Sequence, residues 1–207
     1  MYRYRHIEKL KPAHRNVAAL HGSALHLAIH RLHTQGFNQV LDRLYKAAFD
    51  EVRAEEPEIP IQWKTTEAAD LSRLISNAEE ILEGYSGYPE NQQAAVLYTE
   101  VPFRVRIKEY RLSGTLDQVR RSSDGILELI DLKSGMQRPN SKTLPRDWQL
   151  SLYAYALKYG ELLVNDQWIR PRLTITRTAI YFLRAHEKYK RNSKYGRQGE
   201  EKGSPLM

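Results

Sequence analysis

The spacing of apolar residues changes near residue 90, and this change constrains the fold more than any other feature of the sequence. Up to that point apolar residues recur every three or four positions, which is the period of one helical face. From there on, closely spaced runs alternate between apolar and polar residues, as strands with one buried face do. We therefore expect an α/β protein in which a helical N-terminal part precedes a sheet.

The same patterns predict the bounds of the individual elements. Three helices are expected, over residues 16–33, 38–53 and 66–83. Three strands that follow closely enough to form an antiparallel meander are expected over residues 95–107, 111–121 and 125–132. Asp147 is suited to cap a helix that runs through Tyr159, and the β-branched and aromatic run 173–183 predicts a last strand.

Composition limits the kinds of site that the chain can build. Its 207 residues suit one domain better than two, and a formal net charge of +7 favours a polyanionic partner such as nucleic acid. There is no cysteine, so a metal would be bound by carboxylates, imidazoles or carbonyls, and an iron–sulfur cluster is excluded. The basic N-terminus lacks the apolar region of a signal peptide, and no apolar run approaches the ~20 residues that cross a bilayer. A cytoplasmic protein without membrane contact is expected.

An aspartate and a lysine end the most apolar of the predicted strands, in the segment GILELIDLKSG at residues 125–135. Asp131 and Lys133 are two residues apart and therefore project from the same face of a strand. Asp117, on the preceding strand, can lie beside them in an antiparallel pair. Two close carboxylates repel each other unless a proton or a cation lies between them, and Mg²⁺ prefers such ligands. The group indicates a metal site for phosphodiester hydrolysis, although an Asp-x-Lys pair also suits a plain ion pair at a sheet edge.

The residues around these charges resemble a known family, the PD-(D/E)XK nuclease superfamily, and within it the RecB-like and CRISPR-associated exonuclease branch. Three segments follow the order of that family's motifs: GTLDQV, ELIDLKSG and WQLSLYAYAL. Their matching positions are Gly114 and Asp117, then Asp131, Lys133, Ser134 and Gly135, then Gln149 and Tyr153. The segment GSALH in the first predicted helix is similar to the family's Gly-x-x-x-His setting and contributes Gly22 and His26.

The resemblance implies a restriction-endonuclease-like αβββαβ core, with a mixed central sheet flanked by helices and a helical N-terminal part. It implies one nuclease domain over residues 1–185, mainly helical over 1–90 and with the catalytic sheet and helix over 94–183, followed by a basic, flexible tail over 186–207. Many relatives in this branch join the N-terminal helices to the core with an iron–sulfur cluster. Without cysteine, this chain is expected to close by packing alone.

The resemblance also implies a site for Mg²⁺ or Mn²⁺. The implied ligands are His26, Asp117, Asp131, the backbone carbonyl of Leu132 and, through a water, Glu100. The implied catalytic residues are Asp117, Asp131, Lys133, Gln149 and Tyr153. On a helix, Gln149 and Tyr153 share one face, from which they can contact phosphate or brace Lys133.

DNA is the implied partner, as single strands or duplex ends, and a helicase, another protein or a second copy of the chain is compatible with this. The basic residues expected to contact the DNA backbone are Arg104, Arg106, Arg120, Arg121, Arg138, Lys142 and Arg146. The implied activity is that of a metal-dependent exonuclease in DNA repair, recombination, phage or CRISPR-related processing. Two alternatives stay open: a catalytically silent nucleic-acid-binding or structural subunit of a helicase–nuclease complex, and a hydrolase of a small anion.

Overall fold

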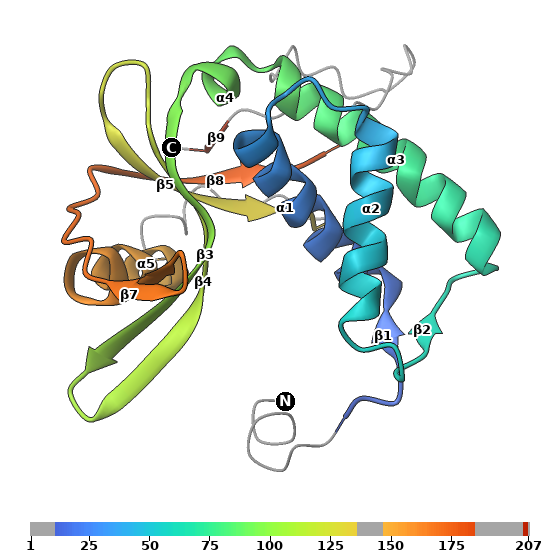
Figure 1. Ribbon diagram of the computed structural model, residues 1–207, viewed down its shortest axis with the longest axis horizontal. Helices are drawn as coiled ribbons and strands as arrows, with labels where there is room; N and C mark the ends of the chain where they lie inside the picture. The colour runs from blue at the N-terminus through green and yellow to red at the C-terminus, as the bar shows by residue number, and fades with distance from the viewer. Residues whose placement is uncertain (1–10, 136–146, 185–204, 207) are drawn as a thin grey trace, which may run out of the picture.

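Five helices surround the sheet in the computed structural model, which describes residues 11–135, 147–184 and 205–206 (Figure 1). The helices are α1 (Val17–Gln35), α2 (Leu41–Ala54), α3 (Glu67–Gly87), α4 (Pro89–Gln93) and α5 (Trp148–Tyr159). Side chains cap three of them at the N-terminus, because Asn16, Thr66 and Asp147 accept hydrogen bonds from the first-turn amides of α1, α3 and α5. The predicted cap at Asp147 is confirmed. Within the described ranges, no helix combines the length and apolar character that a bilayer crossing requires.

A mixed seven-stranded sheet forms the centre of the molecule, in the order β7-β6-β3-β4-β5-β8-β9. Its strands are β3 (Ala95–Ile107), β4 (Tyr110–Arg121), β5 (Leu127–Lys133), β6 (Glu161–Val164), β7 (Gln167–Ile169), β8 (Arg177–Phe182) and β9 (Pro205–Leu206). Only β5 and β8 pair in parallel within it, and the long β3–β4 hairpin extends away from the rest as an arm (Figure 1). A separate two-stranded parallel pair joins β1 (Arg15–Asn16) to β2 (Ile61–Gln62).

The two faces of the sheet are covered by different helices. One core cluster packs α1, α2 and α3 against apolar residues of β5 and β8, including Ile130, Leu132 and Tyr181. The other packs α5 against the opposite face, which includes Val101, Phe103 and Leu129. The expected α/β fold, with a mixed sheet flanked by helices and a helical N-terminal part, is confirmed.

The connection after α5 contains a hairpin, to which the sequence patterns assigned no element. Residues 161–169 form the β6–β7 hairpin, whose turn residues Asn165 and Asp166 both have positive φ, at 49° and 61°. Asparagine and aspartate tolerate this left-handed conformation, which two-residue hairpin turns require. The last long strand was expected from residue 173 but begins at Arg177, because the Leu173 amide donates to the carbonyl of Leu157 near the end of α5. Of the predicted tail, only Pro205–Leu206 lie within the described residues.

Buried polar groups join the helices to the sheet in addition to apolar packing. Tyr85 of α3 accepts a hydrogen bond from Gln118 Nε2 on β4 at 3.2 Å. Arg120, on the same strand, donates to Asn91 of α4 at 2.9 Å and to Glu128 of β5 at 2.8 Å. Hydrogen bonds from α3 and α4 to β4 therefore accompany the apolar packing that joins the helical part to the sheet.

Arg120 had also been expected to contact DNA, which its burial contradicts. Its side chain is only 1% exposed, because it pairs across the strands with Glu128, which is also bonded to Arg177 at 2.7 Å. Arg121, the next residue along β4, is exposed and donates only to the Gly125 carbonyl among the described residues.

We predict that Arg120→Ala lowers the free energy of unfolding by about 3 kcal/mol, because it removes the partner of the buried Asn91 amide oxygen and one of the two partners of buried Glu128. The matched control, Arg121→Ala, is expected to cost no more than about 0.5 kcal/mol. Urea titration followed by circular dichroism measures both. Equal losses in the two variants would show that the Arg120 pair does not secure α4 to the sheet.

Candidate active site

Strands β4 and β5 diverge at the point where the predicted acidic residues lie. Their last paired residues are Gln118 and Ile130, so Asp117 and Asp131 are the first residues beyond the paired segment. The Leu132 amide donates instead to Asp117 Oδ2, at 2.7 Å. The strands thus open into a gap that is lined by two buried carboxylates.

Three side chains near this gap could hold a metal ion. Thr99 pairs with Gln118 and Val101 pairs with Leu116. Glu100 of β3 therefore lies opposite Asp117 of β4. His26 of α1 faces both, with its Nδ1 3.3 Å from Glu100 Oε1 and 3.7 Å from Asp117 Oδ1. One potential ligand atom from each of the three lies within 4.8 Å of the other two. Two carboxylates and an imidazole form an oxygen-rich donor set that suits Mg²⁺ or Mn²⁺.

Glu100 is held in a strained position that points its carboxylate into this group. Its φ is 48°, in the left-handed region that a glutamate rarely adopts. Tyr98 and Val101 both pack toward α5, although strict alternation would place them on opposite faces, so Glu100 takes up the irregularity. Its Oε1 is buried and makes no hydrogen bond within the described part of the chain. A buried carboxylate oxygen without a hydrogen bond is costly, and a cation would satisfy it.

The protonation of this group reflects burial together with close charges. Burial raises the pKa of Asp117 to about 6, with Asp131 and Glu100 adding to the rise and His26 opposing it. Burial alone would lower the pKa of His26, but the nearby Glu100, Asp117 and Asp131 raise it overall. The pKa of Asp131 is raised by burial and partly restored by Lys133. Such a group favours bound protons, which a divalent ion would displace.

A second group lies on the side of the gap that faces α5. Lys133 Nζ donates to Asp131 Oδ1 at 3.2 Å and to Gln149 Oε1 at 3.1 Å, and it lies 2.9 Å from Asp131 Oδ2 as an ion pair. Gln149 Nε2 in turn donates to the Tyr153 hydroxyl at 2.7 Å. Burial tends to lower the pKa of Lys133, but its bond to Asp131 raises it overall, so the amine stays charged at neutral pH. Gln149 therefore braces a permanently cationic lysine.

Two glycines of the predicted motifs allow close approaches around the site. A Cβ on Gly22 would lie 2.8 Å from Ser134 Oγ. The absence of a side chain at Gly22 therefore lets α1 lie close to the end of β5. His26 follows Gly22 by one helical turn and so lies over Asp117. A Cβ on Gly114 would lie 2.8 Å from the Phe103 ring. That ring fills the space and packs edge-on against Tyr153, with centroids 5.4 Å apart.

The structure brings together seven of the residues implied as ligands or catalytic groups, in two clusters. The first holds His26, Glu100 and Asp117, and the second holds Asp131, Lys133, Gln149 and Tyr153. Arg104 and Arg106 lie farther along β3, whereas Arg138, Lys142 and Arg146 lie outside the described residues.

Two supporting residues were given no place in the site from the sequence. His30 follows His26 by one turn of α1, and its Nδ1 lies 3.2 Å from the carbonyl of Thr99, beside Glu100. Its spacing of four from His26 was a usable signal. Phe103 supports Tyr153 through a cross-strand contact over Gly114, which the sequence alone does not reveal.

Comparison with known proteins agrees with this geometry. The family model of the PD-(D/E)XK nuclease superfamily matches residues 1–202 of the 207-residue chain. The chain belongs to the PD-(D/E)XK nuclease superfamily. None of the curated proteins matches it significantly. PD-(D/E)XK nucleases use divalent metal ions, and the donor set of His26, Glu100 and Asp117 fits such an ion.

We predict that the affinity for Mn²⁺ falls as the pH is lowered through about 6, the pKa of Asp117 in the metal-free protein. Because the folded pKa of this acid is raised, its proton is bound up to about pH 6 and must leave before the carboxylate can ligate. The loss should be roughly tenfold per pH unit for each proton released. Calorimetric titration between pH 7.5 and 5 measures it. An affinity that is constant over this range would contradict the assignment of Asp117.

We predict that Gly22→Ala weakens Mn²⁺ binding on the order of tenfold, because the new Cβ meets Ser134 Oγ and displaces His26. The double variant Gly22→Ala/Ser134→Ala should regain most of the affinity, since it removes the atom that the Cβ meets. Ser134→Ala alone is the control and should bind as the wild type does. If the double variant binds no better than Gly22→Ala, close approach of α1 is not what places His26.

Proposed function

We propose that this PD-(D/E)XK nuclease is a Mg²⁺- or Mn²⁺-dependent deoxyribonuclease. The observation that carries the proposal is that His26, Glu100 and Asp117, which we call the ligand cluster, lie beside a lysine that is held by hydrogen bonds. His26 Nδ1 lies 3.3 Å from Glu100 and 3.7 Å from Asp117 on one side of the gap, and Lys133 is bonded to Asp131 and Gln149 on the other. Asp131 and the Leu132 carbonyl complete the proposed ligand set.

The proposed chemistry divides between the two clusters. A bound ion would supply a Lewis acid for the scissile phosphate and would lower the pKa of a bound water. Lys133, fixed by Asp131 and Gln149, donates hydrogen bonds from its ammonium group to the phosphate oxygens and orients the attacking water. Because the pKa of Lys133 is raised, it stabilises negative charge and does not act as a base. Tyr153 holds the Gln149 amide in the orientation that presents Oε1 to Lys133.

We further propose that the enzyme is an exonuclease that acts on the ends of single strands or duplexes. This part rests on the motifs Gly114-x-x-Asp117, Asp131-x-Lys133 and Gln149-x-x-x-Tyr153, which resemble the RecB-like branch. The same resemblance is the basis for proposing a helicase partner and a role in DNA repair, recombination, phage or CRISPR-related processing. A silent binding subunit is the competing function, and an intact Asp117, Asp131 and Lys133 favour catalysis.

We predict that Lys133→Ala lowers the rate of DNA cleavage by roughly 10²–10³-fold, because a positioned cation beside the reacting phosphate is lost. Mn²⁺ binding should persist, since Lys133 is not among the proposed ligands. The matched control is Lys158→Ala, which removes an exposed lysine of α5 that lies over the Tyr159 ring and does not touch the site. End-labelled linear DNA and circular DNA, with Mg²⁺, Mn²⁺ or EDTA, are the substrates.

Cleavage that needs metal, spares circles and disappears in Lys133→Ala would support an exonuclease. Cutting of circles would make the enzyme an endonuclease. If the wild type binds DNA and metal but cuts nothing, the catalytic proposal fails and the silent-subunit function is favoured.

A further inference from the structure

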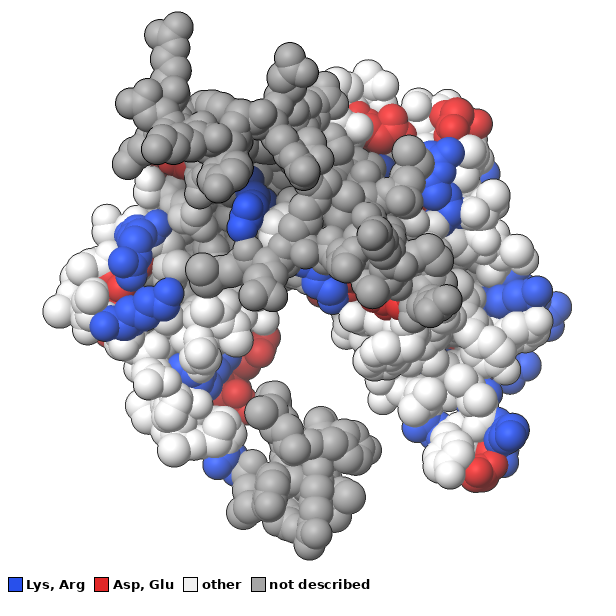
Figure 2. Space-filling model, turned by 180° about the vertical axis from the view of Figure 1, so that it is seen from behind, with Lys and Arg blue, Asp and Glu red and all other residues white. Residues whose placement is uncertain are grey.

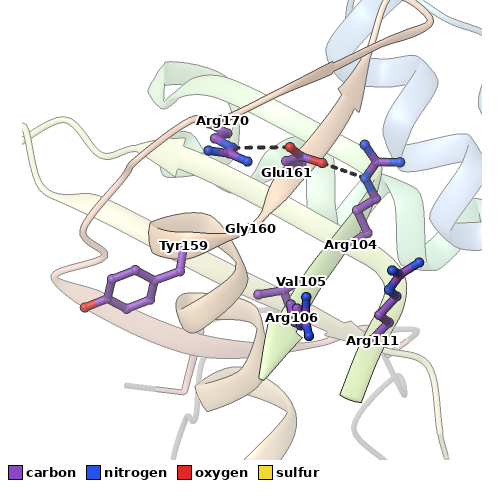
Figure 3. A pocket seen from close by; sticks show the side chains of 8 residues that line it. All are labelled: Arg104, Val105, Arg106, Arg111, Tyr159, Gly160, Glu161 and Arg170. Carbon is purple, nitrogen blue, oxygen red and sulfur yellow. Dashed lines mark hydrogen bonds and ion pairs between the residues drawn. The ribbon is translucent and has the colours of Figure 1, made fainter. Parts of the chain in front are cut away.

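A basic pocket lies on the β3–β4 arm, apart from the ligand cluster. It has a volume of about 390 Å³. Four arginines line it together with Glu161 at the start of β6, and Figure 3 shows Arg170, Glu161 and Arg104 in a row across the strands. We call the four the arginine cluster; they are Arg104, Arg106, Arg111 and Arg170.

The arginine cluster carries more positive charge than its surroundings balance. Glu161 accepts from Arg104 Nε at 2.6 Å and from Arg170 Nε at 3.2 Å. Arg106 Nε donates to the Lys108 carbonyl at 2.8 Å, and the Arg111 side chain has no hydrogen bond within the described residues. Glu161 is the one carboxylate that lines the pocket, and it bonds to two of the four guanidinium groups. The terminal nitrogens of the four arginines have no hydrogen-bond partner among the described residues. Such forked, unpaired ends are suited to phosphate.

Packing holds one of these arginines in place. The Arg104 guanidinium lies over the Trp168 ring of β7, 4.1 Å from its centroid, while Glu161 fixes its Nε. Because the Arg104 side chain is already ordered in the free protein, binding of an anion costs it little further side-chain entropy. Arg104 is nevertheless half exposed, so an anion can reach it.

The arginine cluster shares a face of the arm with the ligand cluster. The pairing of β3 with β4 runs without a shift from Tyr98 to Ile107 and sets Arg104 opposite Ser113 and Arg106 opposite Arg111. Val101, Phe103 and Val105 turn toward α5. Arg104 and Arg106 therefore point to the other face, which is the one from which Glu100 meets His26 of α1.

The spacing of residues along β3 gives the distance between the ligand cluster and the arginine cluster. Arg104 and Arg106 are four and six residues beyond Glu100, which at ~3.3 Å per residue corresponds to roughly 13 and 20 Å. A duplex strand advances about 3.4 Å per nucleotide, so this distance spans about four to six nucleotides. Figure 2 shows the surface hollowed between the arm and the helical part.

We propose that the arginine cluster binds backbone phosphates of the DNA strand being cut, about four to six nucleotides from the scissile phosphate. The proposal rests on the proposed nuclease function and adds a second contact point to it. Its consequence is that long strands bind and turn over better than substrates that reach only the metal ligands. The positive charge of the arginine cluster favours an anionic ligand, and a DNA strand can extend along the shared face from one cluster to the other. An acidic protein surface or a free phosphate would not extend between the two clusters.

The decisive experiment removes the two arginines that do not bond to Glu161. Fluorescence anisotropy with a labelled 20-nucleotide strand, in EDTA and at several salt concentrations, compares wild type with Arg106→Gln/Arg111→Gln. Affinity should fall on the order of tenfold, and the slope of log K against log salt should shrink by about 1.4, or 0.7 for each lost contact. The matched control, Arg43→Gln/Lys46→Gln, removes two exposed charges from α2 and should change little. Glu161→Gln frees Arg104 and Arg170 and should tighten binding.

Hydrolysis of bis(p-nitrophenyl) phosphate in Mn²⁺ supplies the second readout, because this small diester needs only the metal site. It should be unchanged in Arg106→Gln/Arg111→Gln. Equal affinity and slope in the two double variants would overturn the inference, as would parallel losses with DNA and with the small diester. If the wild type binds DNA through these arginines but hydrolyses neither substrate, the phosphate site stands and the proposed nuclease function fails.

Discussion

The hydrogen bond from the Leu132 amide to Asp117 Oδ2 is the contact on which the candidate site depends. Beyond Gln118 and Ile130 the pairing of β4 with β5 ends, and a buried amide would be left without a partner. A side-chain carboxylate takes the place of the missing carbonyl. The bond holds the Asp117 side chain in the gap, and it also satisfies the amide that the end of strand pairing leaves free. The gap and its acidic lining therefore depend on the same contact.

Opposite faces of one sheet supply the two halves of this site. The helical part approaches from one face through His26, and α5 approaches from the other through Gln149. Neither half could reach the other across an intact sheet, because side chains on the two faces point apart. Diverging strands solve this problem, and β5 contributes to both halves through Leu132 and its neighbours Asp131 and Lys133.

Local patterns predicted much of the fold but few of its long-range details. The alternation over residues 95–107 predicts β3 with the bounds it has, and the apolar period of α1 predicts that helix within two residues. Asp147 was identifiable because capping is decided within a few residues. The burial of Arg120 was not, because its partners Asn91 and Glu128 come from other elements and nothing local separates Arg120 from exposed Arg121.

The candidate site follows the same division. Motif spacing brought Asp131, Lys133 and Gln149 to one neighbourhood, since strand and helix periods are local. The direct approach of Glu100 to His26 comes instead with a backbone irregularity, a φ of 48° at Glu100, which the local sequence pattern does not predict. Hydrophobic period also gave no reason to expect β6, whose first residue, Glu161, bonds to Arg104.

The origin of His26 in α1 has a mechanical consequence. The other residues of its cluster, Glu100 and Asp117, belong to the β3–β4 arm, so an ion bound by all three would tie the first helix to that arm. Part of the binding free energy would then appear as resistance of α1 to separation from the sheet. In a chain without cysteine, such an ion would act as a reversible cross-link between α1 and the arm, and its occupancy would follow the surrounding metal concentration.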